Sequence, residues 1–310
     1  MRIAIMGTGG VGGYFGARLA RAEHDVAFIA RGAHLDALRR HGLTIESGGA
    51  SETLRVEATD DPATIGQADI VLFAVKLWDT PVAAEQIRPL IGSDTAVVSF
   101  QNGVVKDDVI AAVLGRAHVV GGASYIAAAI TSPGVIAHTG TLARLVFGEF
   151  DGTRSARIEA FHAVCAEAGI DAAIAPDITV AIWEKFVFLC ALSGLTSITR
   201  LPIGPIRTNA QSRALALDAM REVVAVGRAK GVALSPEFAE ARIAFADGLP
   251  WTMSSSMAGD LARGHRLELP WLAGTVVDLG REFGVPTPVN RVIFDALAPF
   301  IDGTPAGQPA

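Results

Sequence analysis

The sequence predicts an α/β fold, in which an N-terminal Rossmann-type, doubly wound parallel sheet precedes an all-helical C-terminal domain. Three observations support this. The chain opens with a strand, a glycine-rich turn and a helix. Strand and helix patterns then alternate through the first half, as in parallel βαβ units. Beyond about Gly152 the pattern is almost wholly helical. We expect one domain at 1–170 and a second, helical domain at 171–310.

The opening segment carries the clearest motif. An apolar run, Ile3–Met6, leads directly into Gly7-x-Gly9-x-x-Gly12, and a helical pattern follows. In this context the first glycine permits a tight turn, the second lets a pyrophosphate approach the backbone, and the third allows close packing of the helix on the strand. The free N–H groups at the helix start favour phosphate charge. An ordinary glycine-rich turn is the alternative. The predicted cofactor-binding residues here are Gly7, Thr8, Gly9, Gly10, Val11 and Gly12.

The end of the second predicted strand indicates which dinucleotide binds. Arg31 follows the apolar run Asp25–Ala30. Sites for NAD usually carry a carboxylate near this point, which accepts hydrogen bonds from the ribose 2′-hydroxyl. A guanidinium can instead grip a 2′-phosphate with two hydrogen bonds. Arg31 therefore predicts NADPH, although a solvated arginine at a strand end would look the same.

The remaining elements follow from the spacing of apolar residues. A small hairpin is expected from Leu43–Glu46 and Leu54–Ala58. A turn at Thr139–Thr141 is expected to separate the last two strands. The other predicted strands are Ile70–Val75, Ala96–Phe100, Val119–Ile130, Gly134–His138 and Ala143–Gly148. The predicted helices are Asp79–Leu90, Val105–Leu114, Ser155–Ala168, Ile178–Ser193, Ser212–Lys230, Pro236–Ala246, Leu269–Phe283 and a last one from Asn290.

Composition narrows the class of protein. The net charge is −6 and no basic block occurs, so nucleic acid is not an expected partner. Cys165 and Cys190 are expected to be buried free thiols. The seven histidines are scattered, and we expect no metal. A strand at the very start argues against a signal peptide, and the apolar stretch Phe186–Ile198 is short for a membrane span. We expect a cytoplasmic protein that forms a homodimer, with a disordered tail from Asp302.

Several polar residues fall where chemistry is expected. Lys76 and Gln101-Asn102-Gly103 each follow a predicted parallel strand, at the edge where cofactors and substrates bind. Lys185 lies in a very apolar helix, so it either snorkels from the helix edge or occupies a dry pocket. Partial burial lowers the pKa of a lysine and makes it a better acid near neutral pH. Glu268 also fits the pattern of a surface carboxylate. The serines before Asp260 also fit the pattern of helix caps.

Taken in order, these motifs resemble the ketopantoate reductase (2-dehydropantoate 2-reductase) family over nearly the whole chain. The resemblance implies NADPH-dependent reduction of a 2-oxo acid to a 2-hydroxy acid. It implies that Lys185 donates a proton to the ketone oxygen and that Glu268 works with this lysine. The same resemblance implies that Ser256 contacts the substrate carboxylate, and that Asn102 and Lys76 lie near cofactor and substrate. The motifs that carry it are the glycine turn with Arg31, Lys76, Gln101-Asn102-Gly103, Trp183-x-Lys185, Ser255-Ser256-Met257-x-x-Asp260 and Glu268.

The sequence departs from the family at the substrate pocket. The family has asparagines four and eight residues after the lysine, where this chain has Leu189 and Ser193, and a further family asparagine aligns near Ile203. The resemblance implies 2-dehydropantoate as substrate, whereas these departures favour a related and less polar carbonyl compound. Two other classes stay open. One is another two-domain NADP-dependent hydroxyacid or opine-type dehydrogenase, and the other is a non-catalytic NADPH-binding sensor.

Overall fold

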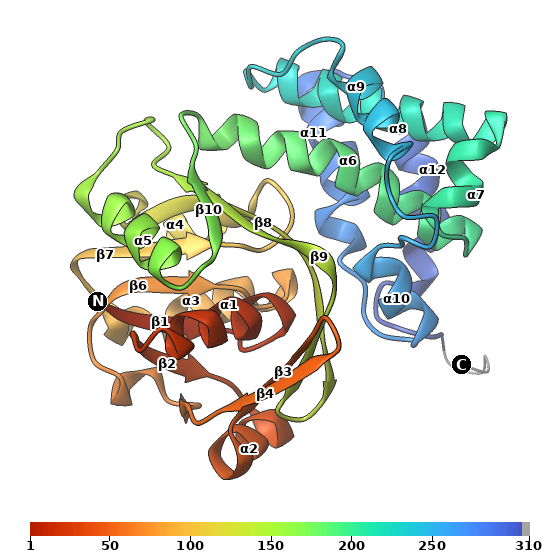
Figure 1. Cartoon of the computed structure of the whole chain (residues 1–310). Helices are drawn as coiled ribbons and strands as arrows, with labels where there is room; N and C mark the ends of the chain where they lie inside the picture. Colours follow the sequence, from red (N-terminus) through yellow and green to blue (C-terminus); the bar gives the residue numbers. More distant parts are fainter. Residues whose placement is uncertain (306–310) are drawn as a thin grey trace. The chain divides into compact units, whose positions relative to one another are not determined.

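The structure is a computed structural model that describes residues 1–305. Its contacts divide the chain into two compact units. The first contains Met1–Gln101 and Lys106–Ile178, and the second contains Asn102–Val105 and the described residues from Thr179 onward. Figure 1 labels the elements along the chain. The assignment of cofactor binding to 1–170 and substrate binding to 171–310 stays a prediction.

The first unit is built on one mixed sheet with a parallel centre, in the order β4-β3-β9-β8-β7-β6-β1-β2-β5, and β10 pairs with β9. Neighbouring strands from β5 to β8 run parallel, whereas β3 with β4 and β8 with β9 are antiparallel. The strands are β1 (Arg2–Met6), β2 (Asp25–Ile29), β3 (Leu43–Ser47), β4 (Ala50–Leu54), β5 (Glu57–Thr59), β6 (Ala68–Phe73), β7 (Ile91–Ser99), β8 (Val119–Ser132), β9 (Val135–Gly148) and β10 (Asp171–Ile174).

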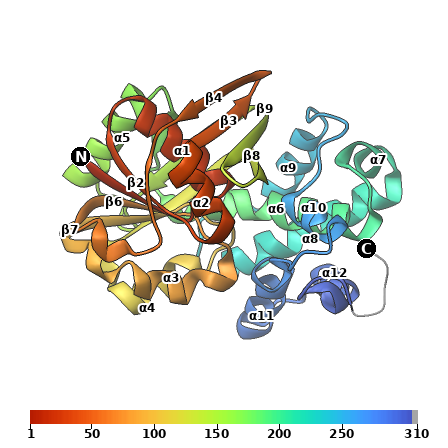
Figure 2. The same cartoon turned by 90° about the horizontal axis from the view of Figure 1, so that it is seen from below.

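Helices cover both faces of this sheet, which confirms the predicted doubly wound architecture. Because side chains alternate along a strand, Ile3 and Ile5 of β1 join one buried cluster while Ala4 and Met6 join the other. Residues of α1, α2 and α5 complete the first cluster and residues of α3 and α4 the second. Figure 2 shows α1 and α5 on one side of the sheet and α3 and α4 on the other. These helices are α1 (Gly10–Arg21), α2 (Gly32–His41), α3 (Thr80–Gln86), α4 (Lys106–Leu114) and α5 (Ala156–Glu167).

Two predictions about the strands of this unit are wrong. The hairpin pairs β3 with β4, not with Leu54–Ala58, because Gly48 and Gly49 both take positive φ and make a two-residue turn. Strand β9 also runs unbroken through the expected turn at Thr139–Thr141. Its register against β8 shifts at Ile126/Ala127, so Gly140, with φ of 78°, marks a bulge. The short strand β10 was not predicted.

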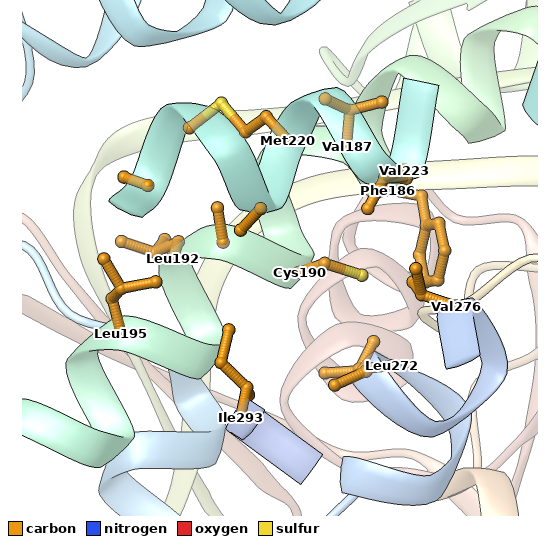
Figure 3. Packing of buried hydrophobic residues seen from close by; sticks show 14 of the residues in the cluster. Phe186, Val187, Cys190, Leu192, Leu195, Met220, Val223, Leu272, Val276 and Ile293 are labelled. Atoms are coloured by element: carbon orange, nitrogen blue, oxygen red, sulfur yellow. The ribbon is translucent and has the colours of Figure 1, made fainter. Parts of the chain in front are cut away.

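The second unit is helical and its core surrounds α6. Figure 3 shows side chains of α6 such as Phe186 and Cys190 packed against Val223, Val276 and Ile293 from other helices. The predicted helix Leu269–Phe283 is interrupted at Leu272, after Pro270 and Trp271. Helices α7 and α10 were not predicted. The elements are α6 (Ile178–Thr199), α7 (Ile203–Thr208), α8 (Ala210–Ala229), α9 (Phe238–Ala246), α10 (Ser256–Ala262), η5 (Leu269–Trp271), α11 (Ala273–Phe283) and α12 (Pro288–Leu297).

Helix α6 is longer than the sequence indicated. Its 22 residues have a window of mean hydropathy 1.7, so among residues 1–305 it alone is long and apolar enough to cross a membrane. The predicted helix Ile178–Ser193 therefore ends too early, and the apolar stretch Phe186–Ile198 is only part of a longer helix. Of this window, 61% is buried inside the structure. Such burial is typical of the core helix of a folded domain.

The prediction for the two cysteines is confirmed, whereas the prediction for the tail is wrong in part. Cys165 and Cys190 are free and buried, as predicted. Burial raises the pKa of Cys165 to about 12 and raises that of Cys190 well above its usual value, so both thiols are poor nucleophiles. In the tail expected to be disordered, the Thr304 N–H donates to the Gly264 carbonyl, so that expectation is wrong there. Residues 306–310 lie outside the described part of the chain.

Candidate active site

The glycine turn joins β1 to α1 in the first unit. Gly7 has φ of 97°, and a Cβ there would lie 2.8 Å from the Val75 nitrogen. A Cβ on Gly12 would lie 2.3 Å from the Gly7 carbonyl oxygen, so this glycine permits close packing. Gly9 is the N-cap of α1, no side chain caps the helix, and a Cβ there would meet nothing within 4 Å. An uncapped helix start beside open space suits a pyrophosphate.

Thr8 holds this turn in place, and His34 contacts the turn between β8 and β9. Thr8 is buried, and its hydroxyl donates to the Ile29 carbonyl at 3.0 Å, which ties the turn to the end of β2. His34 of α2 accepts a hydrogen bond at Nδ1 from the Gly134 N–H at 3.0 Å. Burial lowers the pKa of His34. Sequence reasoning missed His34, because a histidine in a helix gives no signal of its contact with a distant turn.

Arg31 caps α2 at the end of β2, where the sequence predicts the cofactor's adenosine end. Its side chain is 83% exposed and forms an ion pair with Asp79 at 2.7 Å. Asp79 ends η2 (Leu77–Asp79), and Lys76 precedes that turn with its Nζ 5.6 Å from the centre of the Trp78 ring. The loops after β2 and β6 thus place two cations and one carboxylate in the first unit. The sequence did not reveal the pairing of Arg31 with Asp79.

Lys185 and Asn102 meet within the second unit. The Lys185 Nζ donates to the Asn102 Oδ1 at 2.9 Å, although 83 positions separate the two residues. Lys185 is half-buried in α6, between buried Trp183 and Phe186. Asn102 lies in a short loop in which Gly103 has φ of 82°, a conformation that favours glycine. The structure therefore brings together two residues that sequence reasoning selected independently.

The side chains that follow Lys185 on α6 are mostly apolar. Phe188 and Leu189, one turn further on, are half-buried and pack against the hydrophobic cluster of this unit. Phe188 makes an edge contact with Phe245 of α9, at 5.9 Å between ring centres, and Phe245 is 49% exposed. Ser193 is buried, and its hydroxyl has no hydrogen-bond partner among the described residues.

The serines and acidic residues selected from the sequence lie in and around α10 and η5 of the second unit. The Ser255 hydroxyl accepts from the Ala258 N–H and lies 2.9 Å from the Thr196 hydroxyl, so Ser255 caps α10 and links it to α6. Ser256 is the first residue of α10 and is exposed. Asp260 accepts from Arg263 at 2.8 Å. Glu268 is buried directly before η5, and its pairing with Lys185 stays a prediction.

Comparison with known proteins identifies the family. The sequence model for "Ketopantoate reductase PanE/ApbA" matches residues 3–152, and the model for its C-terminal part matches residues 177–300. The chain belongs to the ketopantoate reductase family. It is an oxidoreductase of the type that acts on CH–OH groups, with a small molecule as substrate. Among residues 1–305, no cluster of three or more His, Cys, Asp or Glu could hold a metal ion.

Individual relatives agree with this assignment. The chain is 33% identical to a 2-dehydropantoate 2-reductase of Mesorhizobium japonicum, over 93% of this chain and 94% of that protein. It is 36% identical to a PanE/ApbA family ketopantoate reductase from Ralstonia eutropha, with a TM-score of 0.88 and coverage of 97% and 98%. A D-mandelate dehydrogenase solved with NADH and anilino(oxo)acetate has a TM-score of 0.90 at 21% identity, over 97% and 98% of the two chains, which shows a shared fold.

The two glycines at the start of α1 should respond differently to the same substitution. A Cβ at Gly9 meets nothing, whereas one at Gly10 would lie 2.0 Å from the Ala128 carbonyl oxygen. Gly9→Ala should keep its melting temperature and weaken binding of a reduced nicotinamide dinucleotide about tenfold or more, because it fills the space for the pyrophosphate. Gly10→Ala should cost about 1–3 kcal/mol of stability. Thermal melts and cofactor titrations measure both, and equal behaviour of the two variants would contradict this account.

Proposed function

We propose that this chain catalyses NADPH-dependent reduction of a 2-oxo acid to the 2-hydroxy acid, with Lys185 as proton donor. The observation that carries the proposal is the hydrogen bond from the Lys185 Nζ to the Asn102 Oδ1, 2.9 Å long. It holds a cation at a fixed point in an otherwise apolar helix. A positioned cation of this kind stabilises the negative charge that develops on a carbonyl oxygen during reduction.

The residues of the first unit fit a bound NADPH. The proposed contacts are the backbone of the glycine turn for the pyrophosphate, Arg31 for the 2′-phosphate, and Lys76 and Asn102 towards the nicotinamide end. Residues 30–34, which follow β2, include no carboxylate that would repel a 2′-phosphate. Asp79 accepts a hydrogen bond from the Arg31 guanidinium at 2.7 Å, so its carboxylate competes with a phosphate for this group. When bound, the reduced nicotinamide supplies a hydride to the carbonyl carbon.

Three residues of the second unit are proposed to handle the substrate. The Lys185 ammonium hydrogen-bonds the ketone oxygen and gives it a proton as charge builds up there. Glu268, which is buried, orients the substrate hydroxyl and works with the lysine. Ser256, exposed at the first position of α10, contacts the substrate carboxylate. The Asn102 amide oxygen keeps the ammonium directed at one point before substrate arrives.

The apolar surface beside Lys185 favours a substrate less polar than 2-dehydropantoate. Leu189 and Phe188 lie one turn from the lysine, and Phe245 adds an exposed aromatic ring. A leucine offers no hydrogen bond to a substrate hydroxyl, and an unpaired buried polar group costs about 1–3 kcal/mol. Ser193 retains one hydroxyl but is smaller than asparagine. We therefore propose a 2-oxo acid with an apolar side chain that packs on this surface.

The alternatives differ in which residues they require. Another hydroxyacid or opine-type dehydrogenase would place its catalytic groups elsewhere, and a non-catalytic sensor would have no use for Lys185. The contact of Lys185 with Asn102 favours the reductase. A cytoplasmic location and a homodimer stay predictions from the sequence.

Removal of the proton donor tests the proposed function. We expect purified protein to oxidise NADPH with at least one member of a panel of 2-oxo acids that includes 2-dehydropantoate and compounds with apolar side chains. Lys185→Ala should lower kcat by about 10²–10⁴-fold while NADPH binding is retained. Lys230→Ala, which removes an exposed lysine at the end of α8, serves as control. Full activity in Lys185→Ala would exclude this lysine as the acid.

Arg31 should set the preference for NADPH over NADH. Loss of hydrogen bonds to a charged phosphate costs about 1.5–3 kcal/mol, so Arg31→Ala should weaken NADPH roughly tenfold to a hundredfold and leave NADH nearly unchanged. Asp79→Asn should strengthen NADPH binding, because it removes a negative charge near the phosphate. Arg39→Ala, which changes another exposed arginine of α2, is the control. If Arg31→Ala weakened both cofactors equally, Arg31 would not select the phosphate.

The apolar pocket makes a separate prediction. Leu189→Asn adds an amide where family members carry one, so it should raise kcat/KM for 2-dehydropantoate about tenfold or more, as one regained hydrogen bond allows. The same change should lower kcat/KM for apolar 2-oxo acids. Leu215→Asn on the exposed face of α8 controls for the general effect of the substitution. An unchanged ratio between the two substrate types would show that Leu189 does not face the substrate.

A further inference from the structure

A four-residue segment of the candidate active site groups with a different unit from its neighbours in the chain. Asn102–Val105 groups with the second unit, although the residues on both sides of it belong to the first. Within the second unit, Asn102 accepts the hydrogen bond from Lys185, and Val104 packs against the hydrophobic cluster around α6. Whatever fixes the two ends of this segment therefore also fixes the partner of Lys185.

The first end is held through Gln101, which is buried. Its Nε2 donates to the Val75 carbonyl at 2.9 Å and to the Thr80 hydroxyl at 2.8 Å. Its Oε1 accepts from the Ser99 hydroxyl at 3.0 Å. Both N–H groups and the oxygen of the amide thus have partners, at Val75, at the start of α3 and at the end of β7, which leaves Gln101 one orientation.

The second end is held through Lys106, which is 1% exposed. Its Nζ donates to the Ser99 carbonyl at 3.0 Å and to both carboxylate oxygens of Asp107, at 2.9 and 2.8 Å. Burial lowers the pKa of Lys106 and raises that of Asp107, while each charge favours the other. A buried ion pair of this kind adds little net stability compared with apolar residues of similar size, so stability alone does not explain it.

The residues that hold the two ends, Gln101 and Lys106, both bond to Ser99. Ser99, the last residue of β7, holds Gln101 with its hydroxyl and Lys106 with its carbonyl. Between them lies a segment that contains Gly103, and glycine loses more conformational freedom on ordering than any other residue. We propose that Ser99, Gln101, Lys106 and Asp107 form a clamp that positions Asn102 for Lys185. The clamp residues are positioning residues, and their role in catalysis rests on the proposed function of Lys185.

Two clamp variants and one control test this assignment. Ser99→Ala removes the hydroxyl that holds Gln101 and keeps the carbonyl. Because Lys106→Met alone would strand a buried carboxylate, the second variant is Lys106→Met/Asp107→Asn. The control is Thr95→Val, since Thr95 is a buried hydroxyl on the same strand whose bond to the Ala68 carbonyl lies outside the clamp. For each protein, hydrogen exchange of peptides that cover 100–106, melting temperature, kcat and KM are measured.

The clamp predicts faster exchange in 100–106 in both variants, with kcat lowered about tenfold to a hundredfold, as a small misplacement of a catalytic group allows, and KM little changed. Thr95→Val should alter the melting temperature without either effect. Unchanged exchange in 100–106, or faster exchange with unchanged kcat, would overturn the proposal. If wild-type protein reduced no 2-oxo acid, the proposed function would fail, and the clamp's catalytic role with it, whereas the exchange data would still decide whether the clamp holds the segment.

Discussion

The first unit depends on how closely helix α1 approaches the sheet. Four of its residues are glycines whose Cβ atoms would collide with atoms of the sheet or of the turn before it. At Gly10 and Gly13 the distance would be 2.0 Å, to the Ala128 carbonyl oxygen and to Ile136. At Gly12 and Gly16 the nearest atoms would lie at 2.3 and 2.6 Å. This approach sets the helix start directly at the carboxyl end of β1, where an uncapped N-terminus can serve a phosphate. The fold and the cofactor site thus share one constraint.

The sequence predicts those parts that depend on local spacing. The glycine turn, the alternating strands and helices of the first half and the helical second half are all visible as periods of apolar residues. Gly48, Gly49 and Gly140 show what local spacing cannot predict. Each interrupts a strand pattern, but only the pairing partner decides whether such a glycine makes a hairpin turn or a bulge. The second strand of the hairpin is therefore predicted a few residues too late in the chain, and β9 is predicted as two strands instead of one.

In the candidate site, too, the sequence indicates some residues but not the contacts between them. Lys185 and Asn102 stand out in sequence because each is polar in an apolar or strand-end context, but no spacing rule indicates that they touch across 83 positions. Lys106 and Asp107 give the opposite result. A lysine and two acidic residues at a helix start resemble a solvated surface, yet Lys106 and Asp107 are buried and paired. Tertiary contacts with Ser99 decide this, and they cannot be inferred from composition.

The central claim is that the chain moves a hydride to a carbonyl carbon while Lys185 protonates the oxygen. The most direct measurement is proton NMR of the product formed from an apolar 2-oxo acid and NADPH that carries deuterium at the transferring position. The account predicts a 2-hydroxy acid with deuterium at C2 from wild-type protein, and little product from Lys185→Ala. Product without deuterium at C2, or equal deuterated product from both proteins, would contradict it.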